Sequence, residues 1–159
     1  MKTLFYSLSL STLFFVLPTV AELNHNESIE LLIFKSPSCG CCTKWVEHIS
    51  EMEFTPITKD INANSNTKAK YQIAPEYRSC HTAVTRDGYA FEGHVPAKYI
   101  KQFLKEQPDN SIGLAVPGMP IGTPGMEAGE RFQPYQVLIL FKDGTNEVYA
   151  DILTYSDQF

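Results

Sequence analysis

The chain has 159 residues, of which 43% are hydrophobic and 19% are charged, and its formal net charge is −5. This length is sufficient for one domain with its own hydrophobic core. The acidic balance argues against nucleic acid as a partner, because binding to phosphate backbones requires an excess of lysine and arginine.

Residues 1–21 have the pattern of a cleaved export signal. One lysine precedes an apolar stretch from Leu4 to Leu17, and Thr19-Val20-Ala21 fits a small-residue cleavage site. Serines and a proline keep the stretch below the roughly 20 apolar residues of a membrane span, so we expect no stable membrane anchor after cleavage. We therefore predict a signal peptide over residues 1–21 and a single exported domain over residues 22–159, with a net charge of −6 because one lysine is lost.

The first element of the predicted domain is a buried strand at residues 31–35, LLIFK. A helix follows, because apolar residues recur at intervals of three and four from Cys42 to Met52. Ser38 is its expected N-cap, which places the sequence Cys39-Gly40-Cys41-Cys42 in the opening turn. The positive end of the helix dipole favours thiolates there, and both disulfide exchange and metal binding require thiolates.

Three of the four cysteines therefore lie within four positions, and the fourth is Cys80. In an oxidising compartment, structural disulfides are the usual state of cysteines. A bridge between adjacent or next-but-one cysteines is strained and closes almost no loop. The clustering favours a redox couple or a metal site over a purely structural set of disulfides.

The remaining pattern predicts a second strand at 54–58, a loop with a short helix at 62–73, and a hairpin over 82–95 that turns at Asp87-Gly88. Pro96 begins another helix, which ends before Pro108. The resulting order is β-α-β-α-β-β-α, which is an α/β fold.

Residues 108–134 contain five of the nine glycines, five of the ten prolines and two of the four methionines. A structureless stretch of this length is uncommon in a compact domain unless it is functional or disordered. We predict a long Gly/Pro-rich loop here. After it, the runs 135–141 and 145–151 flank Asp143-Gly144 and predict an extra C-terminal β-hairpin that extends the sheet.

The order of elements resembles the thioredoxin fold, and Cys39 and Cys42 have the thioredoxin-type C-x-x-C spacing. In that fold the segment before the third strand faces the C-x-x-C turn and usually ends in a cis-proline. Here the matching segment is RSCHT, so Cys80 and His81 occupy that place. The departure argues against ordinary thioredoxin chemistry, and it predicts four sulfurs and an imidazole at one location.

Such a set of soft sulfur and borderline nitrogen donors selects Cu(I), Zn(II) or an iron–sulfur centre over hard cations. Met119 and Met126 lie on Gly/Pro-rich backbone without apolar periodicity, so packing does not obviously require their thioethers. Thioethers bind copper well and zinc scarcely at all. The simpler interpretations are a dithiol couple at Cys39 and Cys42, an inert buried Cys80, and methionines that only fill gaps between loop and core.

Four motifs, SPSCGCCTKWVEH, RSCHTAV, GYAFEGHVPA and IGLAVPGMPIGTPGME, occur in order within residues 29–151, the span of the resemblance that they carry. Together they resemble an exported, uncharacterised-domain family of predicted metal-binding proteins that includes the CopG-type periplasmic copper-resistance proteins. The resemblance implies a thioredoxin-like scaffold, a periplasmic location and copper handling. By matching motifs, it implies metal ligation by Cys39, Cys41, Cys42, Cys80, His81, His94, Met119 and Met126.

The leading hypothesis is a periplasmic protein that holds copper as Cu(I) in its cysteine cluster and contributes to copper resistance or homeostasis. Its partners would be copper ions and other periplasmic copper-handling proteins, and several thiolates in contact allow a redox role. The alternative from the enzyme class is a thiol–disulfide oxidoreductase that uses Cys39 as nucleophile and Cys42 as resolving thiol. Zinc binding, an iron–sulfur carrier with four cysteine ligands and a structural disulfide domain are the remaining alternatives.

Overall fold

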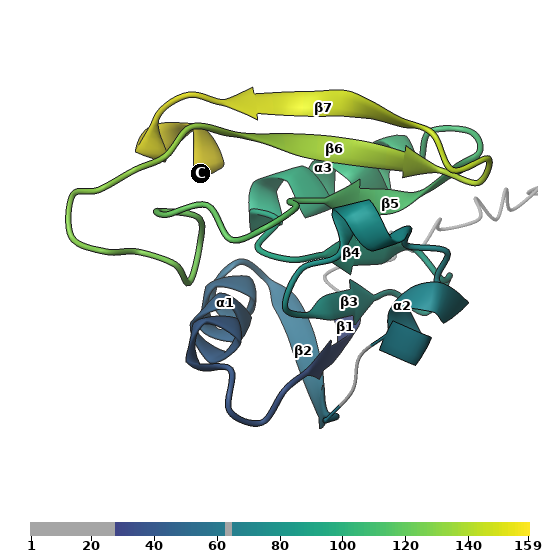
Figure 1. The fold of residues 1–159 in the computed structure, drawn as a ribbon, viewed down its shortest axis with the longest axis horizontal. Helices are drawn as coiled ribbons and strands as arrows, with labels where there is room; N and C mark the ends of the chain where they lie inside the picture. The colour runs from purple at the N-terminus through teal and green to yellow at the C-terminus, as the bar shows by residue number, and fades with distance from the viewer. Residues whose placement is uncertain (1–27, 63–64) are drawn as a thin grey trace, which may run out of the picture.

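The computed structural model describes residues 28–62 and 65–159. The predicted signal peptide, residues 1–21, lies outside the described residues. Over the described part of the chain, no helix has the length and apolar character that crossing a membrane requires. The strands of the described residues join one mixed sheet of seven, in the order β2-β1-β3-β4-β5-β6-β7 (Figure 1).

The fold is α/β, as predicted, and its first seven α-helices and β-strands follow the predicted order. The helices and strands are β1 (Ile29–Lys35), α1 (Gly40–Glu51), β2 (Phe54–Asp60), α2 (Ser65–Lys70), β3 (Thr82–Val84), β4 (Ala90–Glu92), α3 (Ala97–Glu106), β5 (Ser111–Ala115), β6 (Tyr135–Phe141) and β7 (Asn146–Ile152). Two short 3₁₀ helices, η1 (Pro75–Tyr77) and η2 (Tyr155–Gln158), complete the secondary structure.

Strand pairing places alternate side chains on opposite faces of the sheet. Strand β1 is parallel to β2, whereas β3 is antiparallel to both β1 and β4. The register aligns Phe91 with Ala83 on one side and with Leu114 on the other, so these three side chains share a face. The same face receives Trp45 of α1 and Phe103 of α3 and forms the larger core cluster.

A smaller apolar cluster covers the opposite face. It contains Ile73, Ala90, Ile112, Ala115 and Leu140. Figure 1 shows the two layers, with α2 in front of the sheet and α3 behind it. Both faces of the central strands are therefore buried, and the site must form where the strands end and the helices begin.

Strand β5 corrects the prediction of a loop over residues 108–134. Ser111–Ala115 is buried along its whole length and runs parallel to β4. Gly113 is one of the glycines that predict a loop, but its missing side chain is what permits this pairing. A Cβ there would lie 1.7 Å from the carbonyl oxygen of Ala90, and its φ is +145°. The irregular part of the chain is thus residues 116–134.

The C-terminal hairpin β6–β7 extends the sheet as predicted, and the chain then folds back through η2. Gln158 at the end of η2 is fully buried. Its amide oxygen accepts a hydrogen bond from the Tyr135 hydroxyl at 2.7 Å, and its amide nitrogen donates to the carbonyl of Gly122 at 3.0 Å. Gln158 therefore ties the Gly/Pro-rich loop to the sheet, an anchor that the sequence analysis did not predict.

Candidate metal centre

The sequence CGCC lies where β1 passes into α1, and the helix begins one residue later than its predicted cap implied. Cys39, and not Ser38, is the N-cap: its sulfur accepts a hydrogen bond from the backbone N–H of Cys42 at 3.4 Å. The Ser38 hydroxyl instead pairs with that of Ser36 at 3.1 Å. Because the cap residue is itself a cysteine, its sulfur lies at the positive end of the helix.

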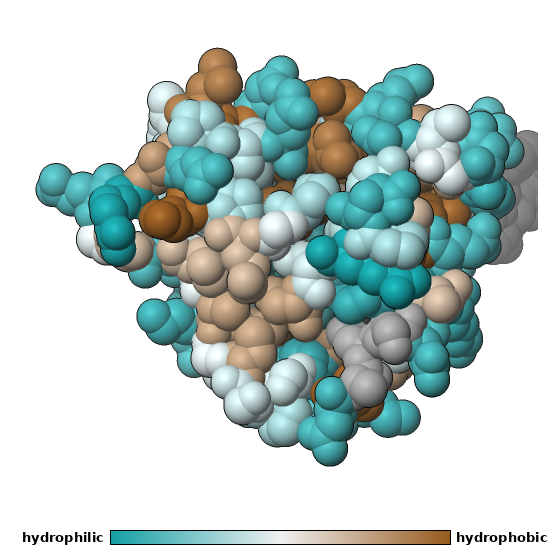
Figure 2. Space-filling model, viewed as in Figure 1, coloured by the Kyte–Doolittle hydropathy of each residue, from teal (hydrophilic) through white to brown (hydrophobic). Residues whose placement is uncertain are grey.

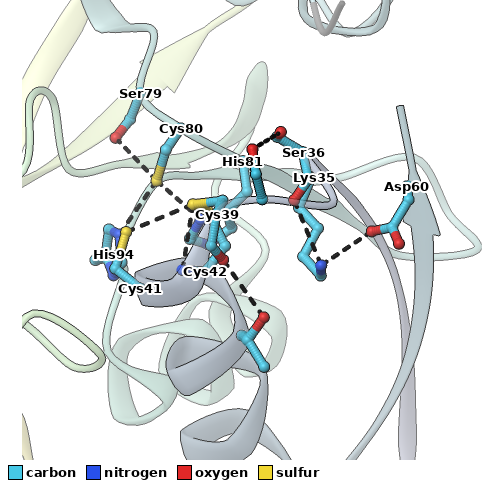
Figure 3. Close-up of a disulfide and its surroundings, with 12 residues drawn as sticks. Lys35, Ser36, Cys39, Cys41, Cys42, Asp60, Ser79, Cys80, His81 and His94 are labelled. Carbon is cyan, nitrogen blue, oxygen red and sulfur yellow. Dashed lines mark hydrogen bonds and ion pairs between the residues drawn. A yellow bond between two sulfur atoms is a disulfide. The ribbon is translucent and has the colours of Figure 1, made fainter. Parts of the chain in front are cut away.

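The four cysteine sulfurs form one group, all within 4.8 Å of one another. Cys39 and Cys42 are joined in a disulfide, while Cys41 and Cys80 are free thiols (Figure 3). The Cys41 sulfur lies 3.5 Å from that of Cys39. The structure thus brings Cys80 to the trio at the start of α1, as the sequence analysis expected from the position of RSCHT.

A second group shares Cys80 and consists of Cys80, His81 and His94, with donor atoms again within 4.8 Å. The Cys80 sulfur lies 3.2 Å from Nδ1 of His81 and 3.1 Å from Nε2 of His94. Figure 3 shows the Cys80 sulfur beside His94 and beside the cysteines at the start of α1. Cys80 is therefore the one residue common to the sulfur group and the mixed group.

A backbone carbonyl fixes the tautomer of His94. Its Nδ1 lies 2.8 Å from the carbonyl oxygen of Pro124, so Nδ1 carries the proton and donates it. The lone pair of Nε2 then faces the Cys80 sulfur. A backbone carbonyl in this second position is a common partner of metal-binding histidines, because it fixes the orientation of the ring. Burial lowers the pKa of His94, so the imidazole is neutral at pH 7.

His81 is fully buried between two rings, those of Trp45 at 4.3 Å and His94 at 5.0 Å between centroids. Its Nε2 has no hydrogen-bond partner among the described residues. Burial, with further contributions from His94 and two lysines, holds its pKa well below the usual value. Because the ring is neutral, one of its two nitrogens has a free lone pair that could bind a metal ion. Nδ1 is the nitrogen that faces Cys80.

Burial, together with the neighbouring Cys41 thiol, raises the pKa of Cys80 to about 11. Cys80 is thus a protonated thiol at pH 7. A soft metal ion binds the thiolate, so binding at this position would release the Cys80 proton. The site combines neutral imidazoles with a thiol that is protonated at pH 7.

The Gly/Pro-rich loop packs directly against the first turn of α1. A Cβ on Gly125 would lie 2.7 Å from both the carbonyl oxygen of Cys41 and the backbone nitrogen of Trp45, and the residue has φ +86°. Only glycine allows this approach without a shift of backbone. One residue earlier, Pro124 holds His94, so the same short segment contacts both donor groups.

The two methionines predicted as ligands lie on this loop. Met119 is 54% exposed and Met126 is half-buried. The carbonyl of Gly118, directly before Met119, accepts a hydrogen bond from the Ser79 hydroxyl at 2.6 Å, which fixes this part of the loop next to the residue before Cys80. Ligation by Met119 and Met126 stays a prediction.

The surface between α1 and the loop is mildly hydrophobic and is framed by hydrophilic side chains on the face shown in Figure 2. Cys39, Cys41 and Cys80 are each partly exposed, whereas Cys42, His81 and His94 are buried. The donors therefore span from the surface to the core, and the sulfur group is the part that solvent reaches.

Two polar features near the site were not predicted. The first is a buried ion pair between Lys68 and Glu92, which lies beneath the RSCHT segment. The second is His48, which the sequence analysis did not select: its Nε2 accepts the backbone N–H of Ala97 at 3.1 Å and caps α3. Spacing gives no signal for either, because both depend on contacts between residues at least 24 positions apart.

Two solved structures are similar to the chain over almost all of their own length. "Copper resistance protein copG, form 1" is 36% identical with a TM-score of 0.74, and the match covers 79% of this chain and 98% of that one. Form 2 is 37% identical with a TM-score of 0.72, and the match covers 79% and 99%. The chain belongs to the CopG-type family.

The predicted resemblance is thereby confirmed. The family described as "Protein of unknown function, DUF411" also matches, over residues 77–126. No curated protein matches the chain. In this member of the CopG-type family, the DUF411 match contains Cys80, His81 and His94, whereas the CGCC sequence precedes it.

Proposed function

We propose that the chain is a periplasmic copper-binding protein that holds Cu(I) in its cysteine cluster and contributes to copper resistance. The observation that carries the proposal is the convergence of four sulfurs and two neutral imidazoles on Cys80. Thiolates prefer Cu(I), and neutral imidazole is a compatible second donor. Both similar structures carry the name of a copper resistance protein, which favours copper over zinc.

The scaffold of this proposal is thioredoxin-like. Its support is the arrangement of the first four strands, β2-β1-β3-β4, with β1 and β2 parallel and β3 antiparallel to its neighbours. The C-x-x-C pair at the start of α1 has the corresponding position. The predicted export signal places the protein in the periplasm, where copper-handling proteins would be its partners.

The disulfide sets the number of sulfur donors. With the Cys39–Cys42 bridge closed, Cys41 and Cys80 are the free thiols of the four. Two electrons and two protons reduce the bridge to two thiols, after which four sulfurs are available. We therefore expect reduced protein to bind more Cu(I) than oxidised protein, and the bridge gives the site a redox role.

Anaerobic titration of the reduced protein, in competition with chelators of known affinity, tests the proposal. We expect Cu(I) to be retained more tightly than Zn(II), with an affinity that depends on the cysteines. Replacement of all four cysteines by serine is the decisive variant. Stronger retention of zinc, or an unchanged Cu(I) affinity in that variant, would contradict the proposal.

The Cys39–Cys42 disulfide itself supports a second candidate, a thiol–disulfide oxidoreductase. In the reduced protein, the Cys39 thiolate would attack a partner disulfide and release one partner thiolate. The Cys42 thiolate would then attack Cys39 in the mixed disulfide, which releases the second partner thiolate and closes the Cys39–Cys42 bridge. Insulin-reductase activity in the reduced protein would test this candidate. It should disappear in Cys39→Ser and persist in Cys41→Ser and Cys80→Ser.

A further inference from the structure

The buried ion pair between Lys68 and Glu92 is the second polar centre of the molecule, and it adjoins the metal site without contributing a donor to it. Glu92 is fully buried at the end of β4, and Lys68 in α2 is 5% exposed. The Lys68 ammonium contacts the Glu92 carboxylate and also donates to the Thr82 hydroxyl at 3.1 Å.

The Glu92 carboxylate holds the RSCHT segment at two points. Its Oε1 accepts the backbone N–H of Ser79, and its Oε2 accepts the hydroxyl of Thr82 at 2.7 Å. Ser79 and Thr82 are the residues directly before and after the Cys80–His81 pair. One carboxylate therefore fixes both ends of the two-residue stretch that supplies a thiol and an imidazole.

The strand pairing explains why the carboxylate reaches both points. Thr82 and Glu92 are directly opposite each other in the β3–β4 pair, so their side chains lie on the same face. The backbone N–H of Gly93 donates to the His81 carbonyl at 2.9 Å and continues this pairing. Lys68 approaches from α2, and its ammonium compensates the negative charge of a carboxylate that is buried away from solvent.

Stability alone does not account for this arrangement. Well-packed apolar residues often replace a buried ion pair with no loss of stability, because both charges must be desolvated. What an apolar pair cannot do is accept the Ser79 N–H and the Thr82 hydroxyl at defined positions. Groups that orient metal ligands in this way commonly alter metal affinity without touching the metal.

We propose that the Lys68–Glu92 pair is the positioning element of the metal site: it fixes Cys80 and His81 where Cys80 belongs to both donor groups. The inference rests on the proposed function for the metal, but it concerns the position of the Cys80 segment itself. Glu92 and Lys68 are positioning residues and not ligands.

Two double variants separate hydrogen bonding from charge. Glu92→Gln/Lys68→Met removes both charges but keeps an amide oxygen that accepts the Ser79 N–H. Glu92→Leu/Lys68→Met removes the acceptor as well. The matched control is Glu53→Leu/Lys101→Met, which deletes an ion pair that is largely exposed and remote from the segment. Near-ultraviolet circular dichroism and thermal unfolding establish that each variant is folded.

Cu(I) affinity is measured on the reduced proteins by chelator competition, and copper ligation by X-ray absorption. We expect Glu92→Leu/Lys68→Met to bind Cu(I) about 10- to 100-fold more weakly, the usual effect of removing groups that orient metal ligands. Its absorption spectrum should lose part of the copper–nitrogen component, that of His81, and keep copper–sulfur. Glu92→Gln/Lys68→Met and the control should stay close to wild type. Wild-type affinity in a folded Glu92→Leu/Lys68→Met protein would overturn the inference.

If that variant does not fold, Thr82→Val decides. Valine keeps the shape of threonine and leaves the ion pair and the Ser79 bond in place, but it removes the hydroxyl that joins Glu92 to the residue after His81. A Cu(I) affinity several-fold below wild type would support the positioning role, and an unchanged affinity would overturn it.

A measurement without metal separates this inference from the proposed function. In Cys41→Ser protein with the Cys39–Cys42 bridge closed, Cys80 is the remaining free thiol. We expect its reaction with a maleimide to be several-fold faster when Glu92→Leu/Lys68→Met is added, because the released segment exposes the sulfur. An unchanged rate would overturn the positioning role even if copper binds. A faster rate would support that role even if wild-type protein retains no Cu(I), which would defeat only the proposed function.

Discussion

The two donor groups that meet at Cys80 are built in different ways. The group of Cys39, Cys41 and Cys42 comes from four consecutive residues at one helix terminus, and a disulfide already closes part of it. In the mixed group, His94 lies 13 residues beyond His81 in the chain. A loop carbonyl holds His94, and a buried ion pair contacts the segment of Cys80 and His81. The first group is local chemistry, whereas the second is a product of tertiary structure.

Because of this difference, substitutions in the two donor groups should have different effects. Substitution of Cys41, a partly exposed free thiol, removes a sulfur atom and should leave the scaffold intact. Substitutions around the mixed group remove or misplace a donor through the fold, so they also change stability. Because Cys80 is common to both groups, it should show the largest effect of any single residue.

Cys80→Ser tests this directly. We expect the reduced variant to bind Cu(I) at least about 100-fold more weakly, beyond the usual range for groups that only orient ligands, because both donor groups lose a sulfur. Chelator competition under anaerobic conditions measures the affinity. Cys41→Ser is the matched control, since Cys41 belongs to one group only. Equal losses in the two variants would show that Cys80 is not shared.

Gly125→Ala should disturb both groups through the loop that joins them. The new Cβ would meet the backbone of Cys41 and Trp45 at a residue with positive φ, and such strain costs roughly 1–3 kcal/mol. Denaturant unfolding measures this loss. Gly40→Ala is the control: nothing lies within 4 Å of its Cβ and its φ is not positive, so we expect no loss of stability. If the Gly125→Ala protein is as stable as wild type, the close packing of the loop against α1 does not help to support the site.

His94→Ala isolates the imidazole of the mixed group. We expect Cu(I) affinity to fall by about tenfold, which corresponds to roughly 1.4 kcal/mol, while copper–sulfur ligation persists. X-ray absorption of the copper-loaded protein should lose part of its nitrogen component. His48→Ala is the comparison, because His48 lies in neither donor group. If both variants bind Cu(I) like wild type, the mixed group contributes no donor from His94.

The smallest expected effect concerns pH and lies outside both groups. Burial lowers the pKa of His48 in the folded protein, and its neutral Nε2 accepts the N–H of Ala97. Since the folded pKa is below the unfolded value of about 6.5, this contribution is complete above pH 6.5 and is lost as the pH falls below it.

His48→Gln should therefore lower the free energy of unfolding by about 1 kcal/mol at pH 7.5, the typical value of a helix cap, and by less at pH 5. Urea denaturation at the two values measures the difference. The Cu(I) affinity should not change. A stability difference that grows toward low pH would have the wrong sign for this cap.

The local parts of the molecule were predictable from sequence, because they depend on neighbours in the chain. The Asp87-Gly88 and Asp143-Gly144 turns mark hairpins that the structure contains. The CGCC sequence marks the sulfur group. The prediction of Ser38 as the N-cap was wrong because the next residue, Cys39, caps the helix. Serine is the more common cap residue, so the pattern alone favoured Ser38.

The tertiary parts were only partly predictable. The place of Cys80 followed from a resemblance of topology, but its contact with His94 depends on the Pro124 carbonyl, 30 residues away from that histidine. Strand β5 was not predicted, because a glycine such as Gly113 is compatible both with a loop and with a closely paired strand. The Lys68–Glu92 pair gave no pattern at all, since two charged residues 24 positions apart usually lie on the surface.

Trp45 is the single tryptophan of the chain. Its indole N–H donates to the Val95 carbonyl at 2.9 Å, and its ring lies 4.3 Å from that of His81, centroid to centroid. The protein thus carries an intrinsic fluorophore whose ring lies next to that of a proposed metal ligand, His81. Quenching of its emission would follow metal arrival in real time, with no external dye attached.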